Sequence, residues 1–354
     1  MSVTKLASKN CENQLPLISV GALKSGNNAQ FLDVADTIGE AARTFGFFRI
    51  CDHGIDPALI ENVYRVAEQF FGLQEDYKNQ YYIAKSSNHR GYVPFTEKGD
   101  YPDEVHRSYE AFDLGLDLPH DDPDYLGGNG VLGPNVWPHL AGFRETIAQY
   151  YDQVSALGRL ICGALEAHLG LPKGAMTDQM CKPISQLRLL HYVRQASTVE
   201  RKSVNMGAHT DYECLTLLHT RNQGLQVMTQ DDNWIDVPVD PNVLIVNIGD
   251  MMEAWTNGIF RSTPHRVLNL KPERFSLPYF VATNYDTEIK PFAQLVGAGQ
   301  KAHYEPFLAG AHLERMLIRD FPYLRHKART GANVTHDFTQ SPVDNPFEGR
   351  LKQG

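Results

Sequence analysis

The chain has 354 residues, of which 42% are hydrophobic and 21% are charged. This mixture suffices for one large or two ordinary domains with a buried core, and it excludes a disordered chain, a collagen and a small disulfide scaffold. The formal net charge of −9 disfavours a broad contact with the phosphate backbone of a nucleic acid.

No apolar run reaches the roughly 18 residues of a membrane-spanning helix, and the first residues lack the apolar segment of a secretory signal. The five cysteines are scattered and include no CxxC pair, which is typical of reduced thiols. We therefore expect a cytoplasmic protein, a monomer or weak homo-oligomer, that binds neither nucleic acid nor membrane.

The first elements are expected between residues 29 and 72. Residues 29–45 have apolar positions at helical spacing and stop at a glycine, residues 47–50 are β-prone, and residues 57–72 begin with proline and end with glycine. These patterns predict helix, strand and helix. Residues 83–137 are rich in Gly, Pro, Asp and Tyr, and loops and short strands are expected there. Residues 1–125 are taken as one N-terminal region.

The longest helical pattern covers residues 139–170 and predicts a spine helix between the N-terminal region and the rest. From 184 to 290 the pattern changes to period two, in short segments separated by Gly, Asn, Asp and Pro. Short strands at this spacing predict a barrel or a jelly roll. Residues 305–320 predict a helix within a C-terminal region, 291–354, that ends in a polar tail. We expect these regions to form one compact unit.

His209 and Asp211 stand two residues apart in the strand-rich region. Residues i and i+2 of a strand share one face, so the imidazole and the carboxylate can point to one position. His265, in a later predicted strand, completes a set of two histidines and one carboxylate. Such a set leaves three coordination positions open, as a non-haem Fe(II) centre requires. A closed structural zinc site would need four ligands.

The same spacing of histidine and acid occurs at His120 and at His312, where it predicts no site. His120 lies in an acidic loop, and His312 lies in a helical pattern, in which residues i and i+2 do not face each other. The pair at His209 therefore points to a metal because of its strand context and its distant partner.

Arg274 lies on a predicted strand soon after His265, and Ser276 shares its face. The planar guanidinium group matches a carboxylate, so this pair predicts a carboxylate anchor near the metal. The alternative is a surface arginine on an edge strand.

Further motifs make a family resemblance close. Residues 46–55 (GFFRICDHGI), 90–94 (RGYVP), 247–250 (NIGD), 256–258 (TNG) and 265–267 (HRV) resemble motifs of the Fe(II)/2-oxoglutarate-dependent dioxygenase superfamily. The similarity is to the branch that contains isopenicillin N synthase and the plant soluble dioxygenases, and it covers nearly the whole chain. It implies a mainly β fold with flanking helices and a double-stranded β-helix, or jelly-roll, core.

The resemblance also implies roles for the residues singled out above. His209, Asp211 and His265 correspond to the ligands of Fe(II). Arg274 and Ser276 correspond to the holders of the distal carboxylate of the co-substrate 2-oxoglutarate. With O2, the implied reaction oxidises a C–H bond of a small-molecule substrate and releases succinate and CO2.

Tyr192 is similar in place to a family tyrosine that bonds the same carboxylate, although the surrounding LLHYVR departs from the NYYPPC pattern of the plant members. Arg188 shares the face of Tyr192 by alternation and resembles by position a substrate-binding arginine of a distant relative. A structural arginine on the barrel surface is the alternative. The resemblance also implies that residues 90–95 form a loop at the cavity mouth, so the other substrate-binding candidates are Arg90, Tyr92 and Phe95.

Two alternatives to a 2-oxoglutarate-dependent oxygenase stay open. One is a 2-oxoglutarate-independent Fe(II) oxidase or cyclase of the isopenicillin N synthase type, in which the Arg-x-Ser pair serves another anion. The other, of a different class, is a non-catalytic jelly-roll binding protein, and the intact metal-ligand set argues against it.

Overall fold

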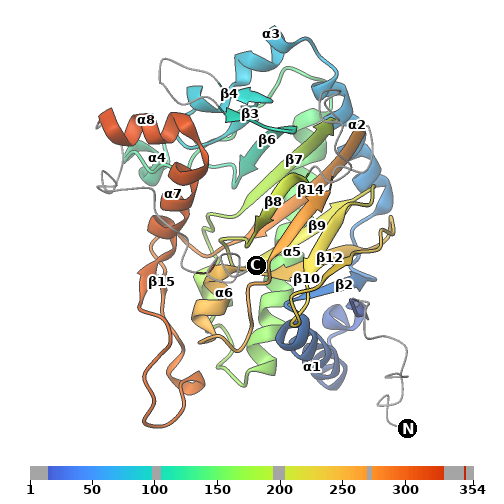
Figure 1. The fold of residues 1–354 in the computed structure, drawn as a ribbon, viewed down its shortest axis with the longest axis vertical. Helices are drawn as coiled ribbons and strands as arrows, with labels where there is room; N and C mark the ends of the chain where they lie inside the picture. The colour runs from blue at the N-terminus through green and yellow to red at the C-terminus, as the bar shows by residue number, and fades with distance from the viewer. Residues whose placement is uncertain (1–14, 98–104, 194–203, 269–272, 331–346, 348–354) are drawn as a thin grey trace.

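The computed structural model describes residues 15–97, 105–193, 204–268, 273–330 and 347. Figure 1 shows a sheet-rich centre with helices α1, α2 and α5 on one side and helices α7 and α8 near one end. The arrangement confirms the predicted jelly-roll class. Within the described residues, no helix is both long enough and apolar enough to cross a membrane.

The larger of two facing sheets carries most of the framework. All its neighbouring strands pair antiparallel except the first two. In the described residues its strand order is β1 (Leu17–Ser19), β2 (Phe47–Cys51), β12 (Leu244–Ile248), β9 (Leu215–Thr220), β14 (Glu273–Val281), β7 (Gln186–Val193), β6 (Tyr109–Gly115) and β3 (Gly91–Val93).

The smaller sheet has the order β11 (Trp234–Asp236), β10 (Leu225–Met228), β13 (His265–Leu268) and β8 (Val204–His209). Two short antiparallel pairs join β4 (Thr96–Glu97) to β5 (Val105–His106) and β15 (Glu288–Ile289) to β16 (Phe307–Leu308).

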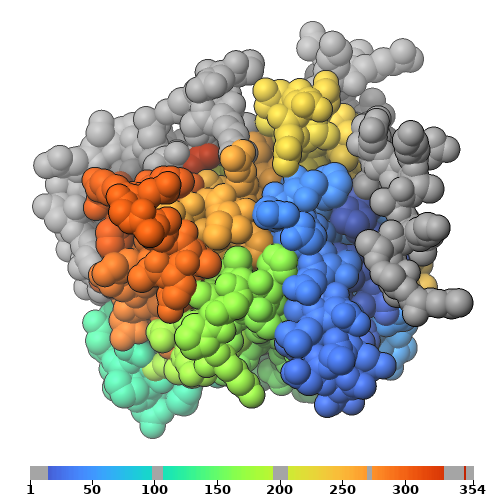
Figure 2. Space-filling view, turned by 90° about the horizontal axis from the view of Figure 1, so that it is seen from below, coloured from blue at the N-terminus to red at the C-terminus, as the bar shows by residue number. Residues whose placement is uncertain are grey.

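The helices lie outside the sheets. They are α1 (Asn28–Phe45), α2 (Pro57–Phe71), α3 (Glu75–Lys78), α4 (Pro123–Leu126), α5 (Phe143–His168), α6 (Asp250–Trp255), α7 (Ala309–Asp320) and α8 (Pro322–Thr330). Single 3-10 turns occur at η1 (Gly21–Lys24), η2 (Asn79–Tyr81), η3 (Ile83–Lys85), η4 (Thr177–Gln179) and η5 (Ala293–Leu295). In Figure 2 the blue N-terminal segment and the green α5 lie side by side across one face.

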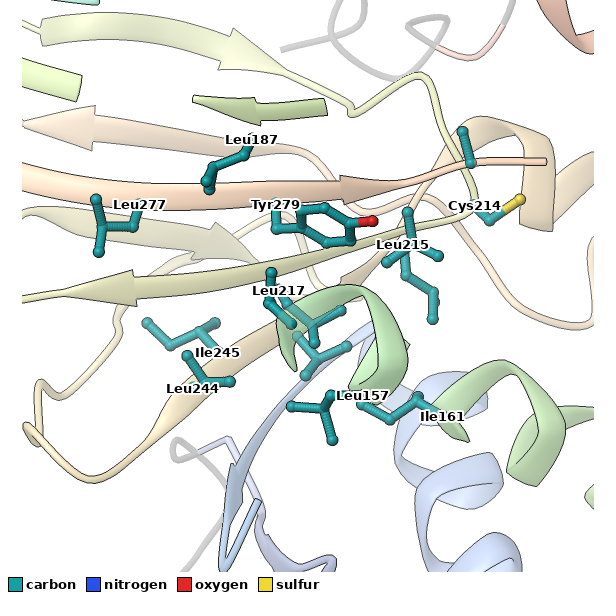
Figure 3. Close-up of a cluster of buried hydrophobic side chains, with 14 of the residues drawn as sticks. Leu157, Ile161, Leu187, Cys214, Leu215, Leu217, Leu244, Ile245, Leu277 and Tyr279 are labelled. Carbon is teal, nitrogen blue, oxygen red and sulfur yellow. The ribbon is translucent and has the colours of Figure 1, made fainter. Parts of the chain in front are cut away.

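The central strands of the large sheet separate two environments by alternation. Leu187, Leu217 and Leu277 face the helices and pack with Leu157 and Ile161 of α5 in the core of Figure 3. Their neighbours in the sequence point to the opposite face, where the two sheets enclose a cavity. This division follows from the period of two in a β-strand, and it decides which side chains can reach a site between the sheets.

Several predicted elements are confirmed. The helix expected at 29–45 is α1, which Asn27 caps by accepting hydrogen bonds from the amides of Ala29 (3.0 Å) and Gln30 (3.2 Å). The helix expected at 57–72 is α2, with Pro57 in its first turn and Asp56 as its cap. The described cysteines are unpaired, and Cys11 lies outside the described residues.

The predicted boundaries of two helices were wrong at the N-terminal end. The spine helix α5 begins at Phe143, because Gly142 before it adopts a left-handed conformation with φ 74°. The later helix α7 begins at Ala309, because the two preceding residues form strand β16. The chain after α7 was expected to be an irregular tail, yet Pro322 starts a further helix, α8, as proline in a first helical turn can.

Gly46 joins α1 to β2 in a left-handed conformation with φ 66°. A Cβ atom there would lie 2.1 Å from Oγ1 of Thr263 and 2.5 Å from the carbonyl oxygen of Arg261. These two neighbours lie just before β13, so the glycine lets the N-terminal region pack closely on the strand that carries His265.

Replacing Gly46 by alanine adds backbone strain to a steric clash, so Gly46→Ala should lower the free energy of unfolding by about 2–4 kcal/mol in urea titrations. Gly26→Ala is the matched control, because Gly26 has φ 74° but nothing within 4 Å of its Cβ position. The free energy of unfolding of Gly26→Ala should fall by about 1–2 kcal/mol, the backbone strain alone. Equal losses in the two variants would contradict the packing account.

Candidate metal centre and cavity

His209, Asp211 and His265 meet between the sheets. His209 ends β8 and His265 begins β13, and the two residues are direct partners in this antiparallel pair. Nε2 of His209 lies 3.7 Å from Oδ1 of Asp211, and Nε2 of His265 lies 3.6 Å from the same oxygen. One potential ligand atom from each residue falls within 4.8 Å of the others, so a single ion can reach all three.

The strand prediction for this motif holds only in part. Strand β8 stops at His209, and Asp211 lies in the loop that follows, so shared strand alternation does not place its carboxylate. The contacts of Asp211 do so instead. Its Oδ2 accepts hydrogen bonds from Oγ1 of Thr216 and from Nδ2 of Asn247 (2.7 Å), which leaves Oδ1 directed at the histidines.

Hydrogen bonds to the backbone fix the tautomer of each histidine. Nδ1 of His209 donates to the carbonyl oxygen of Gly207 (2.8 Å), and Nδ1 of His265 donates to that of Thr263 (3.3 Å). A carbonyl can only accept, so each Nδ1 carries the proton and each Nε2 keeps a lone pair for a metal.

The electrostatics favour the same ligand forms. Burial and the neighbouring His209 lower the pKa of His265 to about 4, so this imidazole is neutral at pH 7. Burial alone would raise the pKa of Asp211, but His265, His209 and its hydrogen bonds hold that pKa below the usual value. Two imidazoles and one carboxylate form a donor set that suits Fe(II) with three positions left open.

Arg274 supplies a second feature, a buried positive charge. It is 3% exposed, and its Nε and Nη1 have no hydrogen-bond partner in the described structure. Across the β14–β7 pair it lies opposite Tyr192, whose ring centre is 4.9 Å from the guanidinium carbon. Burial raises the pKa of the Tyr192 phenol, while Arg274 and Ser276 act against that rise. A buried, incompletely paired guanidinium group fits a carboxylate ligand.

A cavity of about 730 Å³ connects the two features. Its lining includes the three potential metal ligands, Arg274 with Ser276 and Tyr192, and apolar side chains from both sheets. This volume is within the range of small-molecule sites. The structure thus brings together all six residues that the sequence assigned to metal and co-substrate.

Arg188 also lines the cavity, and its charge is balanced. Its Nε and Nη2 donate to the two carboxylate oxygens of Asp113 on the neighbouring strand, at 2.6 and 2.7 Å. Its position in the cavity with Tyr192 agrees with the prediction that alternation puts these two residues on one face. The alternative of an arginine on the barrel surface does not fit it.

The other three substrate candidates do not line this cavity in the described structure. Arg90 is fully buried, and its guanidinium group donates to backbone carbonyls, including that of Val131 (2.6 Å). The Tyr92 hydroxyl donates to Glu110 (2.6 Å), and Phe95 packs near His191 on the far side of β7. Their contacts are those of residues that hold the loop in place.

Sequence reasoning missed the wall that the corner between α7 and α8 provides. The ring centre of Phe321 lies 5.2 Å from the guanidinium carbon of Arg107 and 5.7 Å from that of Arg188. The Tyr212 hydroxyl donates to Asp320 (2.5 Å), which ties this corner to the residue after Asp211. The chain there was taken for the start of a polar tail, and the signal that could have predicted α8 is Pro322, because proline is favoured in the first turn of a helix.

Glu213 was missed as well. It lines the cavity at 4% exposure, and burial together with the charge of Asp211 raises its pKa to about 8. Asn247 stood in the NIGD motif, but its contact with Asp211 depends on a strand pairing that the motif alone does not reveal.

Comparisons with known proteins agree with this geometry. Residues 15–140 match the family model of the non-haem dioxygenase in morphine synthesis N-terminal domain, and residues 184–283 match that of the 2OG-Fe(II) oxygenase superfamily. The chain is 32% identical to the 2-oxoglutarate-dependent dioxygenase tropC of Talaromyces stipitatus, over 76% of this chain and 85% of the relative. It is also 32% identical to the clavatol oxidase claD of Penicillium crustosum, over 82% and 91%.

Among solved structures, a full-length Neurospora crassa protein in complex with alpha-KG matches with a TM-score of 0.77 and 27% identity. The match covers 88% of this chain and 98% of that protein. The likeness therefore extends to the helices outside the jelly roll.

The contacts of Asp211 lead to a test by metal titration. Thr216→Val removes one of the two hydrogen bonds that orient the carboxylate, and it should weaken Fe(II) binding by about 10- to 100-fold in anaerobic titrations. Thr220→Val, on the same strand, is the control and should leave the metal affinity unchanged, because Thr220 donates to backbone carbonyls away from Asp211. A normal Fe(II) affinity in Thr216→Val would show that these hydrogen bonds do not orient the ligand.

Proposed function

This chain belongs to the Fe(II)- and 2-oxoglutarate-dependent dioxygenases, and we propose that its iron is held by His209, Asp211 and His265. The distal carboxylate of 2-oxoglutarate then binds Arg274, with Ser276 and Tyr192 beside it. The observation that carries this assignment is the shared cavity, which holds a complete donor set for the metal and a buried guanidinium group with unused donors.

The family establishes the reaction class: a small molecule is oxidised with iron and 2-oxoglutarate, and bound iron supplies the capacity to activate O2. The residues of the chain position and shield that chemistry. Thr216 and Asn247 hold the Asp211 carboxylate in one orientation. Phe47 packs edge-on against His265, with 5.3 Å between ring centres, and limits the access of water from that side.

Of the functions that the sequence left open, the 2-oxoglutarate-dependent oxygenase has the support of the comparisons. Several curated relatives carry that co-substrate in their names, and the related Neurospora crassa structure contains alpha-KG. A 2-oxoglutarate-independent oxidase would need another anion beside Arg274. The intact set of three potential metal ligands argues against a binding protein without catalysis.

A cytoplasmic location and a monomeric or weakly associated state stay predictions. The unpaired thiols of Cys51, Cys162, Cys181 and Cys214 support a reducing compartment.

The assignment of Arg274 is tested by anaerobic titration of the Fe(II) protein with 2-oxoglutarate, followed through the weak visible charge-transfer band of the chelate. Arg274→Met removes a charge-assisted contact in a buried site, so the concentration of 2-oxoglutarate at half saturation should rise by roughly 10- to 100-fold. Asp211→Ala should abolish the band because iron is no longer held.

Arg266→Met is the matched control. Arg266 stacks over Trp234, 4.1 Å from the ring centre, and does not line the cavity in the described structure. Its titration should equal that of the unaltered protein. Unchanged 2-oxoglutarate binding in Arg274→Met would refute the proposed anchor, whereas iron binding without any band in the unaltered protein would favour the 2-oxoglutarate-independent oxidase.

A further inference from the structure

Glu213 is a buried carboxyl group whose presence the metal and co-substrate do not explain. Its successor Cys214 belongs to the hydrophobic core of Figure 3, whereas Glu213 lies on the wall of the cavity. In the described part of the chain, no other residue donates a hydrogen bond to its carboxyl group. The one donor to it in the described structure is its own backbone N–H, so the buried carboxyl keeps acceptor capacity that a donor from a ligand can use.

Arg188 is the charged neighbour that matters here. It lines the same cavity, and its positive charge acts on the Glu213 carboxyl. Asp113 occupies Nε and Nη2 of Arg188, and within the described residues Nη1 makes no hydrogen bond. The cavity wall therefore offers a hydrogen-bond acceptor on Glu213 and a free donor on Arg188.

The charges around this pair favour a neutral ligand group. Asp113 already balances Arg188, so the arginine does not require an anion. A carboxylate has no N–H or O–H to donate to Glu213, and a cation would be repelled by Arg188. A carboxyl group keeps an acceptor lone pair in both of its protonation states, so the argument does not depend on the charge of Glu213.

We propose that Glu213 and Arg188 form a subsite for a neutral polar group of the substrate, with an N–H or O–H donating to Glu213 and an adjacent carbonyl oxygen accepting from Arg188. Carboxamides, lactams and hydroxycarbonyl compounds carry this combination. Leu218, Phe280 and Leu317 line the same cavity and suit the hydrocarbon part of such a molecule. The inference rests on the proposed function, because it treats the cavity as the substrate site.

Three probes with one hydrocarbon frame test the subsite. 3-Phenylpropanamide has both the donor and the acceptor, 4-phenylbutan-2-one is its isostere without the donor, and 3-phenylpropanoate carries a negative charge instead. Their affinities are measured by calorimetry on the anaerobic protein loaded with Fe(II) and 2-oxoglutarate. The amide should bind about 10-fold more tightly than either other probe, the effect of one hydrogen bond to a carboxyl group.

Variants of Glu213 separate recognition from a structural role. Glu213→Leu removes the acceptor at similar volume and should abolish the preference for the amide over the ketone. Glu213→Gln keeps an acceptor oxygen and should retain that preference. Glu305→Leu is the control. Glu305 is exposed and does not line the cavity in the described structure, so this variant should bind the probes as the unaltered protein does.

The double variant Arg188→Met with Asp113→Leu removes the ion pair as a unit, so that no buried charge is left unpaired. This variant should lower the affinities for the amide and for the ketone by the same factor, since the carbonyl oxygen of each probe accepts from Arg188.

Three results would overturn the subsite: no preference for the amide over the ketone, tighter binding of 3-phenylpropanoate than of the amide, or an unchanged amide preference in Glu213→Leu. The charge-transfer band of the loaded protein, recorded before any probe is added, keeps this failure apart from failure of the proposed function. A normal band without an amide preference would refute the subsite and leave the proposed function intact. A missing band would refute the proposed function, on which the subsite rests.

Discussion

The strict alternation of side chains along β7, β9 and β14 is the constraint on which the site depends. On these strands Leu187, Leu217 and Leu277 enter the core against α5, and the residues beside them in sequence, Arg188 and Ser276 among them, enter the cavity. A slip of register by one residue would exchange the two sets and place arginine side chains in the apolar layer. The apolar core therefore fixes the orientation of the polar site.

The cavity in turn holds buried polar groups that destabilise the fold when no ligand is bound. Arg274 keeps two guanidinium nitrogens without partners, and Glu213 keeps a buried carboxyl group without a donor from another described residue. Such groups persist when the surrounding structure is stable enough to hold them and when a ligand completes their contacts. The three proposed metal ligands, by contrast, are oriented in advance, through backbone carbonyls for the histidines and through Thr216 and Asn247 for Asp211.

The parts of the site that follow from local pattern could be predicted from the sequence. The period of two placed Arg274 with Ser276 and Arg188 with Tyr192, and the family resemblance assigned His265 to the same site as His209. What depends on distant pairing could not be predicted: the contact of Asn247 with Asp211, and the clamp of Asp113 on Arg188. The α7–α8 wall was missed because the chain after residue 320 was taken for a polar tail, although Pro322 can start a helix. The loop candidates Arg90, Tyr92 and Phe95 rested on resemblance, and in the structure their contacts hold the loop together.

The central claim is that one cavity holds iron on His209, Asp211 and His265 and holds 2-oxoglutarate on Arg274. A crystal structure of the protein grown anaerobically with Fe(II) and 2-oxoglutarate tests it most directly. The account predicts metal density bonded to Nε2 of both histidines and to Oδ1 of Asp211, with a carboxylate on the Nε and Nη1 atoms of Arg274. Metal density at other side chains, or 2-oxoglutarate bound away from Arg274, would contradict it.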